Sequence, residues 1–256
     1  MTRWRLVRDG EHAPAANLAR DEALFLAGSG PTLRLYLWNP PGLSLGYFQP
    51  RDRPLPPGVT VVRRPTGGGA IFHRCEVTYC AVAPLATRTM RGALGGLSIP
   101  DSYEVLHQGV LRALESLGIR AHLARPNDID SPDDSSEPAA FLCFQRRSPT
   151  DLIVQGRKIV GSAQRRTRER LLQHGSVLLR AQPDGPRSVG VQDLLASPVT
   201  TEDVCQALVQ GFEAALDAEL VPGSLDADEI LLAERLVRDR YEDPHWRRSS
   251  RIAPPR

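Results

Sequence analysis

The sequence lacks the features that would point to a metal ion, a membrane or a nucleic acid. Its 256 residues contain four cysteines, and although four residues separate Cys75 from Cys80, no second pair of ligands follows at the spacing of a zinc site. No apolar run approaches the roughly 18 residues of a membrane span, and the N-terminus leads into no hydrophobic signal region. The formal net charge of +2 is too small to indicate a nucleic-acid partner. We therefore expect a cytoplasmic protein with free thiols and with neither metal nor cofactor.

The composition is that of an ordinary globular protein. Hydrophobic residues make up 41% and charged residues 24% of the chain, whose length is sufficient to bury a sizeable core. Arginines gather towards the C-terminus, where Arg247, Arg248 and Arg251 lie close together. A solvated tail is the plainer interpretation of this cluster, and the docking of an acidic partner is the alternative. We expect a single domain over residues 1–256 that ends in a short basic C-terminal tail.

The chain predicts strands in adjacent runs with helices around them. Leu33, Leu35 and Leu37 alternate as on one face of a strand at 32–38. Apolar steps of three and four residues predict a helix capped by Asp101 or Ser102 that stops at Gly118. The other predicted elements are helices at 16–27, around 204–216 and roughly at 226–240, and strands at 43–48, 59–64, 77–83, 151–155, 158–164 and 171–179. This order favours an α+β fold with a mostly antiparallel or mixed β-sheet and flanking helices.

A glycine-rich segment, residues 63–73 with the sequence RRPTGGGAIFH, follows one of these strands. Without Cβ atoms, Gly67, Gly68 and Gly69 let a ligand approach the backbone closely, and their amides can form a nest for an anion or a carbonyl. A flexible hairpin turn is the plainer interpretation of three glycines alone. The preceding Arg64 would add positive charge to such a nest, whereas a histidine such as His73 is by itself more often structural than catalytic.

A lysine motif, residues 156–164 with the sequence GRKIVGSAQ, follows the predicted strand at 151–155 and includes the one at 158–164. Apolar positions flank Lys158, so that its ammonium is expected partly inside the protein, where it can hold an oxyanion or a carboxylate. A surface lysine on a hairpin with a turn at Gly156-Arg157 is the alternative. The small side chains at Gly161 and Ser162 are typical of a strand that lines a pocket.

The segment FLCFQ contains Cys143, directly after a Pro-, Asp- and Ser-rich stretch at 125–140. Long loops of this kind inside a domain are often lids or binding loops. A free cysteine is usually a small buried hydrophobic residue, and this remains the interpretation for Cys80, mid-strand, and for Cys205, near a helix start. The position of Cys143 after a candidate lid favours a nucleophile instead.

Together these motifs resemble the family of lipoate-protein ligases and octanoyltransferases, which is related to the biotin-protein ligases. The similarity runs roughly from residue 4 to 247 and includes LARDEAL at 18–24, WNPPGLSLG at 38–46 and the glycine and lysine motifs. It implies the biotin/lipoate-protein ligase-like catalytic domain. Cys143 followed by the lysine motif is similar to the LipM-type octanoyltransferase branch, in which a cysteine at this place accepts the acyl group.

The resemblance implies a reaction and its participants. An octanoyl-acyl carrier protein would donate the acyl group to Cys143, with Lys158 as oxyanion partner, and a lysine of a lipoyl domain would then receive it without ATP. Acceptors of this kind are the glycine cleavage H protein and the E2 subunit of 2-oxoacid dehydrogenases. The proposed substrate-binding residues are Arg64, Gly67, Gly68, Gly69, His73, Gly161 and Ser162.

Three other functions remain open at this point. An ATP-dependent lipoate-protein ligase shares the fold, and a lipoyl-domain amidotransferase shares the cysteine chemistry. A non-catalytic lipoyl-domain binder is the third, because Arg74 and Cys75 follow the motif histidine where the family often has an acidic residue. That departure leaves the role of His73 open.

Overall fold

The main sheet of the computed structural model combines strands that are far apart in the sequence. The structure describes residues 2–50, 57–85, 94, 96–128, 141–145, 148–183, 185 and 187–248. Within these residues eight strands pair in the order β11-β1-β2-β6-β10-β9-β8-β7. Their bounds are β1 Thr2–His12, β2 Thr32–Trp38, β6 Glu76–Pro84, β7 His122–Leu123, β8 Leu152–Val154, β9 Arg157–Arg166, β10 Arg170–Leu178 and β11 Ala218–Gly223.

The sheet is mixed, as the sequence predicted. The first strand, β1, pairs in parallel with β2 and with β11, whereas the β2–β6, β6–β10, β10–β9, β9–β8 and β8–β7 pairs are antiparallel. Along β6 the side chains alternate, so that Tyr79 and Ala81 belong to the core on one face and Cys80 and Val82 to the core on the other. A sheet buried on both faces needs helices on both sides.

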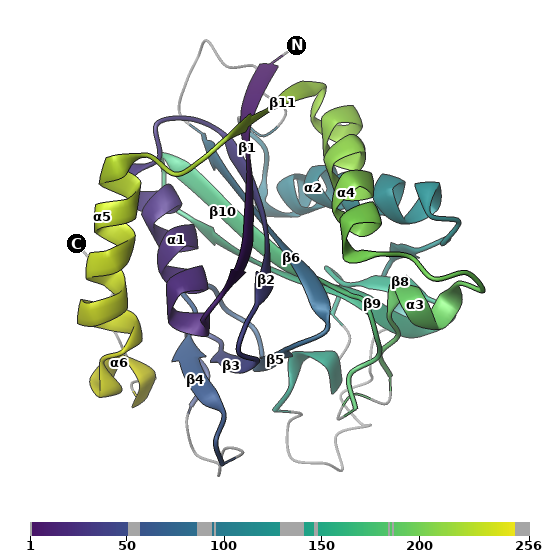
Figure 1. The fold of residues 1–256 in the computed structure, drawn as a ribbon. Coiled ribbons are helices and arrows are strands. Elements are labelled where there is room, and N and C mark those ends of the chain that lie inside the picture. The colour runs from purple at the N-terminus through teal and green to yellow at the C-terminus, as the bar shows by residue number, and fades with distance from the viewer. Residues whose placement is uncertain are drawn as a thin grey trace.

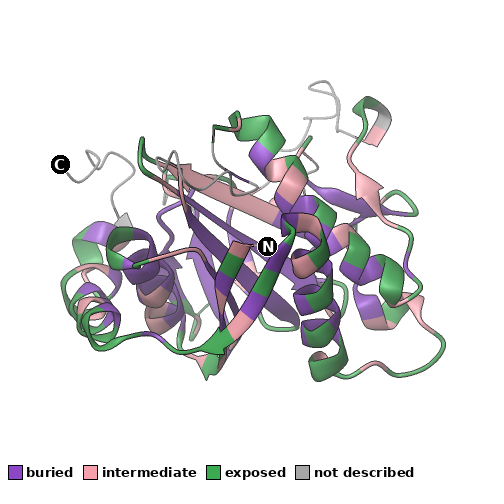
Figure 2. Ribbon diagram, turned by 90° about the horizontal axis from the view of Figure 1, so that it is seen from above, coloured by how far each residue is buried: buried purple, intermediate pink, exposed green. Residues whose placement is uncertain are grey.

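Two pairs of helices cover those two faces (Figure 1). Helices α1 and α5 pack on one face, and α2 and α4 pack on the other. Figure 2 shows the strands between them buried and the outer helix surfaces exposed. The helices are α1 Pro14–Ala27, α2 Ile99–Ser116, α3 Val191–Leu194, α4 Thr201–Leu216, α5 Ala227–Leu236 and α6 Pro244–Arg248, with a π-helical turn at Val237–Tyr241 and 3₁₀ turns at Pro126–Asp128 and Cys143–Gln145. No helix among the described residues is both long and apolar enough to span a bilayer.

A second, smaller sheet carries the glycine motif. Its described strands pair in the order β4-β3-β5, with β3 at Gly42–Leu45, β4 at Thr60–Arg63 and β5 at Ile71–His73. A Cβ on Gly46 would lie 1.8 Å from the carbonyl oxygen of Gly68, so this glycine lets the motif fold back against the end of β3. Arg63 joins the small sheet to α6, because its guanidinium donates to the carbonyl oxygens of Trp246 and Arg247.

Several boundaries differ from the sequence-based predictions. The helix α2 is capped by Ser98, whose hydroxyl accepts from the amide of Asp101 at 3.3 Å, and not by Asp101 or Ser102. It begins earlier because proline, here at the second helical position, is well tolerated in a first turn. The turn between β8 and β9 consists of Gln155 and Gly156, both with positive φ, one residue before the predicted Gly156-Arg157. The expected lid at 125–140 and the basic tail lie largely outside the described residues.

Candidate active site

A pocket lies between the small sheet and the main sheet. Cys143 lies in its wall, and β2, β3, β6, β9 and β10 all contribute lining side chains. The residues around it are Leu18, Tyr36, Trp38, Ser44, Arg64, Gly68, Ile71, His73, Thr78, Cys143, Gly161, Ser162, Ala163, His174, Gly175 and Ser176.

Cys143 is held against the end of the glycine motif by backbone hydrogen bonds. Its amide donates to the carbonyl oxygen of Ala70 at 2.6 Å, and the Ala70 amide donates to Phe141 at 2.9 Å. A Cβ on Gly69 would lie only 3.2 Å from the Cys143 nitrogen, so the third glycine permits this close approach. The Cys143 amide is therefore already engaged and does not point at a reacting carbonyl.

Lys158 lies directly beside this cysteine. Its Nζ is 3.4 Å from the Cys143 Sγ and 3.1 Å from the Cys143 carbonyl oxygen. It is also 2.8 Å from an Asp151 carboxylate oxygen, and the ring of Phe144 lies 4.9 Å away. Only 1% of the Lys158 side chain is exposed, which confirms the expectation of an interior ammonium and rejects a surface lysine on a hairpin.

The charges of Lys158 and Asp151 depend on each other. Burial by itself lowers the pKa of Lys158, but the negative charges available at Cys143 and Asp151 outweigh it and raise this pKa above its ordinary value. Burial raises the pKa of Asp151 more than Lys158 and the Ser148 amide lower it. Lys158 therefore keeps its proton at neutral pH, and on acidification the Asp151 carboxylate is protonated at a higher pH than an ordinary aspartate.

Arg64 is a second buried cation at the pocket, held in a different way. Its guanidinium donates to the carbonyl oxygens of Gly67 at 2.6 Å and Gly69 at 2.8 Å, and to the backbone and hydroxyl oxygens of Ser44 at 3.2 Å. In the part of the chain that the structure describes, its Nε has no hydrogen-bond partner. Burial lowers the pKa of Arg64 to about 10, so it remains charged at neutral pH.

His73 is fixed on both ring nitrogens. Nδ1 is 2.7 Å from a Glu76 carboxylate oxygen, and Nε2 is 2.7 Å from the Ser44 hydroxyl. The ring also stacks on Trp38 with 3.7 Å between centroids. Glu76 thus supplies the carboxylate that Arg74 does not. With both nitrogens occupied, the imidazole forms a wall of the pocket rather than a mobile proton carrier.

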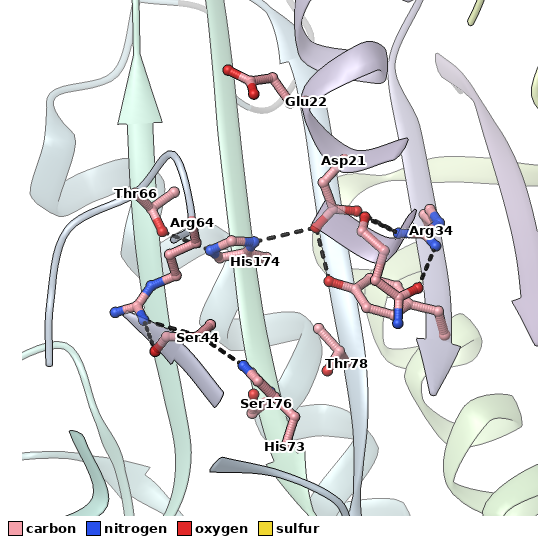
Figure 3. Close-up of polar contacts among 12 residues, drawn as sticks. Asp21, Glu22, Arg34, Ser44, Arg64, Thr66, His73, Thr78, His174 and Ser176 are labelled. Carbon is pink, nitrogen blue, oxygen red and sulfur yellow. Dashed lines mark hydrogen bonds and ion pairs between the residues drawn. The ribbon is translucent and has the colours of Figure 1, made fainter. Parts of the chain in front are cut away.

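His174 is a second histidine with a partner at each ring nitrogen, and it was not among the predicted site residues. Figure 3 shows His174 between Asp21 and Thr66; its Nδ1 is 3.2 Å from the carboxylate and its Nε2 is 2.7 Å from the hydroxyl. Burial lowers the pKa of His174 even against the pull of Asp21, which favours a neutral ring. Asp21 in turn accepts from Arg34 and Tyr36. This network fixes His174 in the wall of the pocket.

The small residues of β9, Gly161 and Ser162, lie against different neighbours. A Cβ on Gly161 would lie 2.9 Å from Cε and 3.1 Å from Nζ of Lys158, so this glycine leaves the space that the lysine occupies. The Ser162 hydroxyl is 2.8 Å from the Tyr79 hydroxyl and 3.0 Å from Nε2 of His107. Burial lowers the pKa of His107 to about 4, and the ring is therefore neutral at neutral pH.

The predicted site residues thus divide into three groups. Arg64, Gly68, His73, Gly161 and Ser162 line the pocket together with Cys143. Lys158 contacts Cys143 from behind the lining, and Gly67 and Gly69 contribute carbonyl oxygens to Arg64. Three further residues were not predicted at the site although each lies in a predicted strand, namely Ser44, Asp151 and His174.

The other cysteines lie in different surroundings. Cys80 and Cys205 are buried, and burial raises the pKa of both thiols, which agrees with their interpretation as packing residues. Cys75 is exposed. Among the described residues, no group of three or more histidine, cysteine or acidic side chains is arranged to hold a metal ion.

Comparison with known proteins shows the family of the chain. The lipoyl protein ligase A/B catalytic domain family matches residues 13–189, more than half of the chain. The protein therefore belongs to this family. An octanoyltransferase LipM of Kyrpidia tusciae is 39% identical over 96% of this chain and 98% of its own length. The LipM of Bacillus subtilis is 30% identical over 95% and 97%. These names agree with the enzyme class expected from the sequence, an acyltransferase.

Solved structures share the fold. A putative lipoate protein ligase from T. acidophilum with bound lipoic acid superposes with a TM-score of 0.79 at 24% identity, over 96% of this chain and 99% of that one. A lipoate-protein ligase A bound with ATP gives 0.78 at 23% identity, over 96% and 98%. The expected biotin/lipoate-protein ligase-like fold is confirmed.

Proposed function

We propose that the protein is a single catalytic domain that moves an octanoyl group from a carrier-protein thioester to a lysine of a lipoyl domain, through a thioester on Cys143. The observation that carries the proposal is the 3.4 Å contact between the Lys158 ammonium and the Cys143 sulfur at the wall of a pocket. A charged lysine favours the thiolate, which is the nucleophilic form of cysteine. The names of the LipM relatives support the same reaction.

In the first half-reaction the Cys143 thiolate attacks the carbonyl carbon of the octanoyl-acyl carrier protein. A carbon–sulfur bond forms, and the carbonyl oxygen becomes a tetrahedral oxyanion. Lys158 is the donor we assign to this oxyanion, because the Cys143 amide already donates to Ala70. The intermediate collapses with loss of the carrier thiolate and leaves an octanoyl thioester on Cys143.

In the second half-reaction the neutral amine of the target lysine attacks the Cys143 thioester. A carbon–nitrogen bond forms, the Cys143 thiolate departs, and the new amide loses one proton to solvent. Conversion of a thioester into an amide is downhill, so neither step needs a nucleotide. The acceptors we propose are lipoyl domains such as those of the glycine cleavage H protein and of 2-oxoacid dehydrogenase E2.

The binding roles follow from the same contacts. Arg64 holds the carbonyl oxygens of the glycine loop and so fixes the backbone that carries Cys143. His73 and Ser162 are among the polar residues in the wall of the pocket proposed to hold the acyl chain. We assign substrate binding to these residues and to the loop of Gly67, Gly68 and Gly69, and the chemistry to Cys143 and Lys158.

Intact-mass measurement tests the covalent intermediate. Incubation with octanoyl-acyl carrier protein should add one octanoyl group, and hydroxylamine should remove it. Cys143→Ala should abolish the adduct. The matched control is Cys75→Ala, because Cys75 is the exposed thiol most accessible to unspecific acylation. An adduct that persists in Cys143→Ala would refute the assignment.

Omission of nucleotide tests the reaction class. Octanoylation of a lipoyl domain should proceed in buffer stripped of ATP and magnesium. Product that forms only from free octanoate and ATP, with release of pyrophosphate, would instead identify a lipoate-protein ligase. Transfer only from an octanoylated protein would identify an amidotransferase, and binding without transfer would identify a non-catalytic binder.

A further inference from the structure

Asp151 is buried next to the proposed catalytic pair but has no role in the reaction described above. Its side chain is 2% exposed, and one carboxylate oxygen accepts from Lys158 at 2.8 Å and from the Ser148 amide at 2.7 Å. The β8–β9 hairpin brings the two residues together, because Ile153 on β8 is opposite Lys158 on β9. Lys158 thus directs its three donors at the carboxylate, the Cys143 carbonyl oxygen and the Cys143 sulfur.

The charged and titratable groups around Lys158 come from several elements. Cys143 faces it from the 3₁₀ turn and Asp151 from the start of β8. Arg64, after β4, and Tyr103, on α2, interact electrostatically with Cys143. Burial raises the pKa of Tyr103 to about 12, so this hydroxyl is neutral over the working pH range. Only Cys143 and Asp151 supply negative charge to Lys158 among the described residues.

These two negative charges differ in one respect. The charge on Cys143 exists only while the sulfur is a thiolate, and it disappears when the sulfur becomes a neutral thioester. The Asp151 carboxylate takes no part in bond formation, so acylation of the sulfur does not remove its charge. In the acyl-enzyme, burial would favour the neutral amine of Lys158 if no carboxylate remained beside it.

We propose that Asp151 is a positioning residue that keeps Lys158 protonated and aimed at Cys143 during the second half-reaction. This role rests on the proposed function. With its charge retained, Lys158 stabilises the oxyanion formed when the target amine attacks, and then the Cys143 thiolate as it leaves. In the first half-reaction the thiolate itself holds the ammonium, so that Asp151 contributes less there.

Single-turnover transfer separates the two half-reactions. Octanoylated enzyme is isolated by gel filtration and mixed with excess lipoyl domain, and the loss of the adduct is followed by intact mass over a series of pH values. In Asp151→Asn the carboxylate charge is gone, so the pKa of Lys158 in the acyl-enzyme falls. The alkaline limb of the pH–rate profile, where Lys158 loses its proton, should then move by at least about one pH unit towards lower pH. The transfer rate near pH 8 should be about tenfold lower. Only acylated molecules are counted, which excludes unfolded protein from the rate.

Three further variants distinguish positioning from general support of the fold. Asp151→Glu keeps the charge and should keep the alkaline limb in place even if the rate falls. Asp151→Ser, a second neutral variant, should shift the limb as Asp151→Asn does if the latter folds poorly. Glu229→Gln, which breaks the buried ion pair with Arg5 outside the pocket, is the matched control and should leave the limb unchanged.

A double-mutant cycle tests whether Asp151 acts through Lys158. In a Lys158→Met background, Asp151→Asn should change the transfer rate by less than about twofold. The role proposed for Asp151 is wrong if Asp151→Asn leaves the alkaline limb unchanged, or if it lowers the transfer rate equally in the unaltered and the Lys158→Met proteins. Either result would leave the proposed function standing. Absence of any octanoyl adduct on the unaltered protein would overturn the proposed function itself.

Discussion

Lys158 and Arg64 are both fully buried cations beside Cys143, yet the protein holds them with different partners. Lys158 is paired with the Asp151 carboxylate and touches the sulfur. Arg64 is surrounded by carbonyl and hydroxyl oxygens of Ser44, Gly67 and Gly69. The carboxylate allows a lysine to remain charged in an interior that favours its neutral form, whereas an arginine needs no such help because its intrinsic pKa is higher.

These different partners indicate different functions for the two cations. A compact ammonium with three donors can hold a sulfur or an oxyanion at one point. A planar guanidinium instead spans several carbonyl oxygens and fixes a loop. We therefore expect that altering Lys158 mainly affects the reaction rate, and that altering Arg64 mainly affects stability. Exchanging each cation for the other type tests this contrast most directly.

The largest effect is expected at Lys158. Lys158→Met should lower single-turnover acylation of Cys143 by about 10²–10³-fold, the usual loss for one oxyanion donor. Lys158→Arg should restore little activity, because a planar guanidinium cannot take the place of the compact ammonium that contacts both Cys143 and Asp151. Rates are measured per folded molecule, since loss of the lysine leaves Asp151 buried without its partner. Full-rate acylation in Lys158→Met would remove the residue from the mechanism.

The reverse exchange, Arg64→Lys, should act mainly on stability. An ammonium cannot reach both glycine carbonyls and Ser44 together, so the free energy of unfolding should fall by about 3 kcal/mol. Urea unfolding measures this loss. Arg74→Lys, at an exposed position after the same motif, is the matched control and should stay within about 0.5 kcal/mol. If Arg64→Lys instead lowers acylation as much as Lys158→Met does, at unchanged stability, the contrast between the two cations is wrong.

A smaller effect is expected from crowding the lysine without removing it. Gly161→Ala places a methyl group against Cε of Lys158, so the ammonium must move away from the sulfur. Acylation should fall about tenfold with little change in melting temperature, because small displacements of a catalytic group are costly. Gly30→Ala, whose added methyl group would meet no atom within 4 Å, should behave like the unaltered protein. Equal rates in both variants would mean that the position of Lys158 is not critical.

The smallest effect is expected at His107, a buried base without a charged partner among the described residues, whose Nε2 lies 3.0 Å from the Ser162 hydroxyl. Its pKa is about 4 in the folded state, below the ordinary value, so the unfolded chain binds the proton first as the pH falls. The stability of the protein should therefore decrease on acidification, and His107→Gln should weaken this dependence by about 1 kcal/mol between about pH 6.5 and pH 5.5. Parallel urea unfolding curves at the two pH values measure it. If the free energy of unfolding changes equally between the two pH values in His107→Gln and in the unaltered protein, His107 is uncharged in both the folded and unfolded states or charged in both.

The elements that the sequence predicted best are those with strong local signals. The strand at 32–38 was predicted with its observed bounds, because alternating leucines end at Pro40 and Pro41. The strand β1 was missed, because Arg3, Arg5 and Arg8 interrupt its apolar pattern and its partner β11 lies more than 200 residues away. Pairing between such distant segments leaves no periodicity in either of them.

The site was predicted in part for the same reason. Cys143 and Lys158 lie in motifs that stand out, and the structure brings them into contact. The partners that define their chemistry depend on geometry. Asp151 faces Lys158 only because a two-residue turn sets the register of β8 and β9. His73 finds its carboxylate at Glu76, three residues on, and its hydroxyl at Ser44 on another strand.

The attachment of α6 to Arg63 has a consequence for synthesis. A ribosome makes Cys143, Lys158 and the glycine motif well before it makes residues 244–248, and domains generally fold as units as the chain emerges. Until then the guanidinium of Arg63 lacks the carbonyl oxygens of Trp246 and Arg247, and β4 lacks the indole that donates to the Arg63 carbonyl at 3.0 Å. A nascent chain therefore carries the residues proposed for the reaction before the small sheet has its full support, and β4 gains that support only when α6 docks.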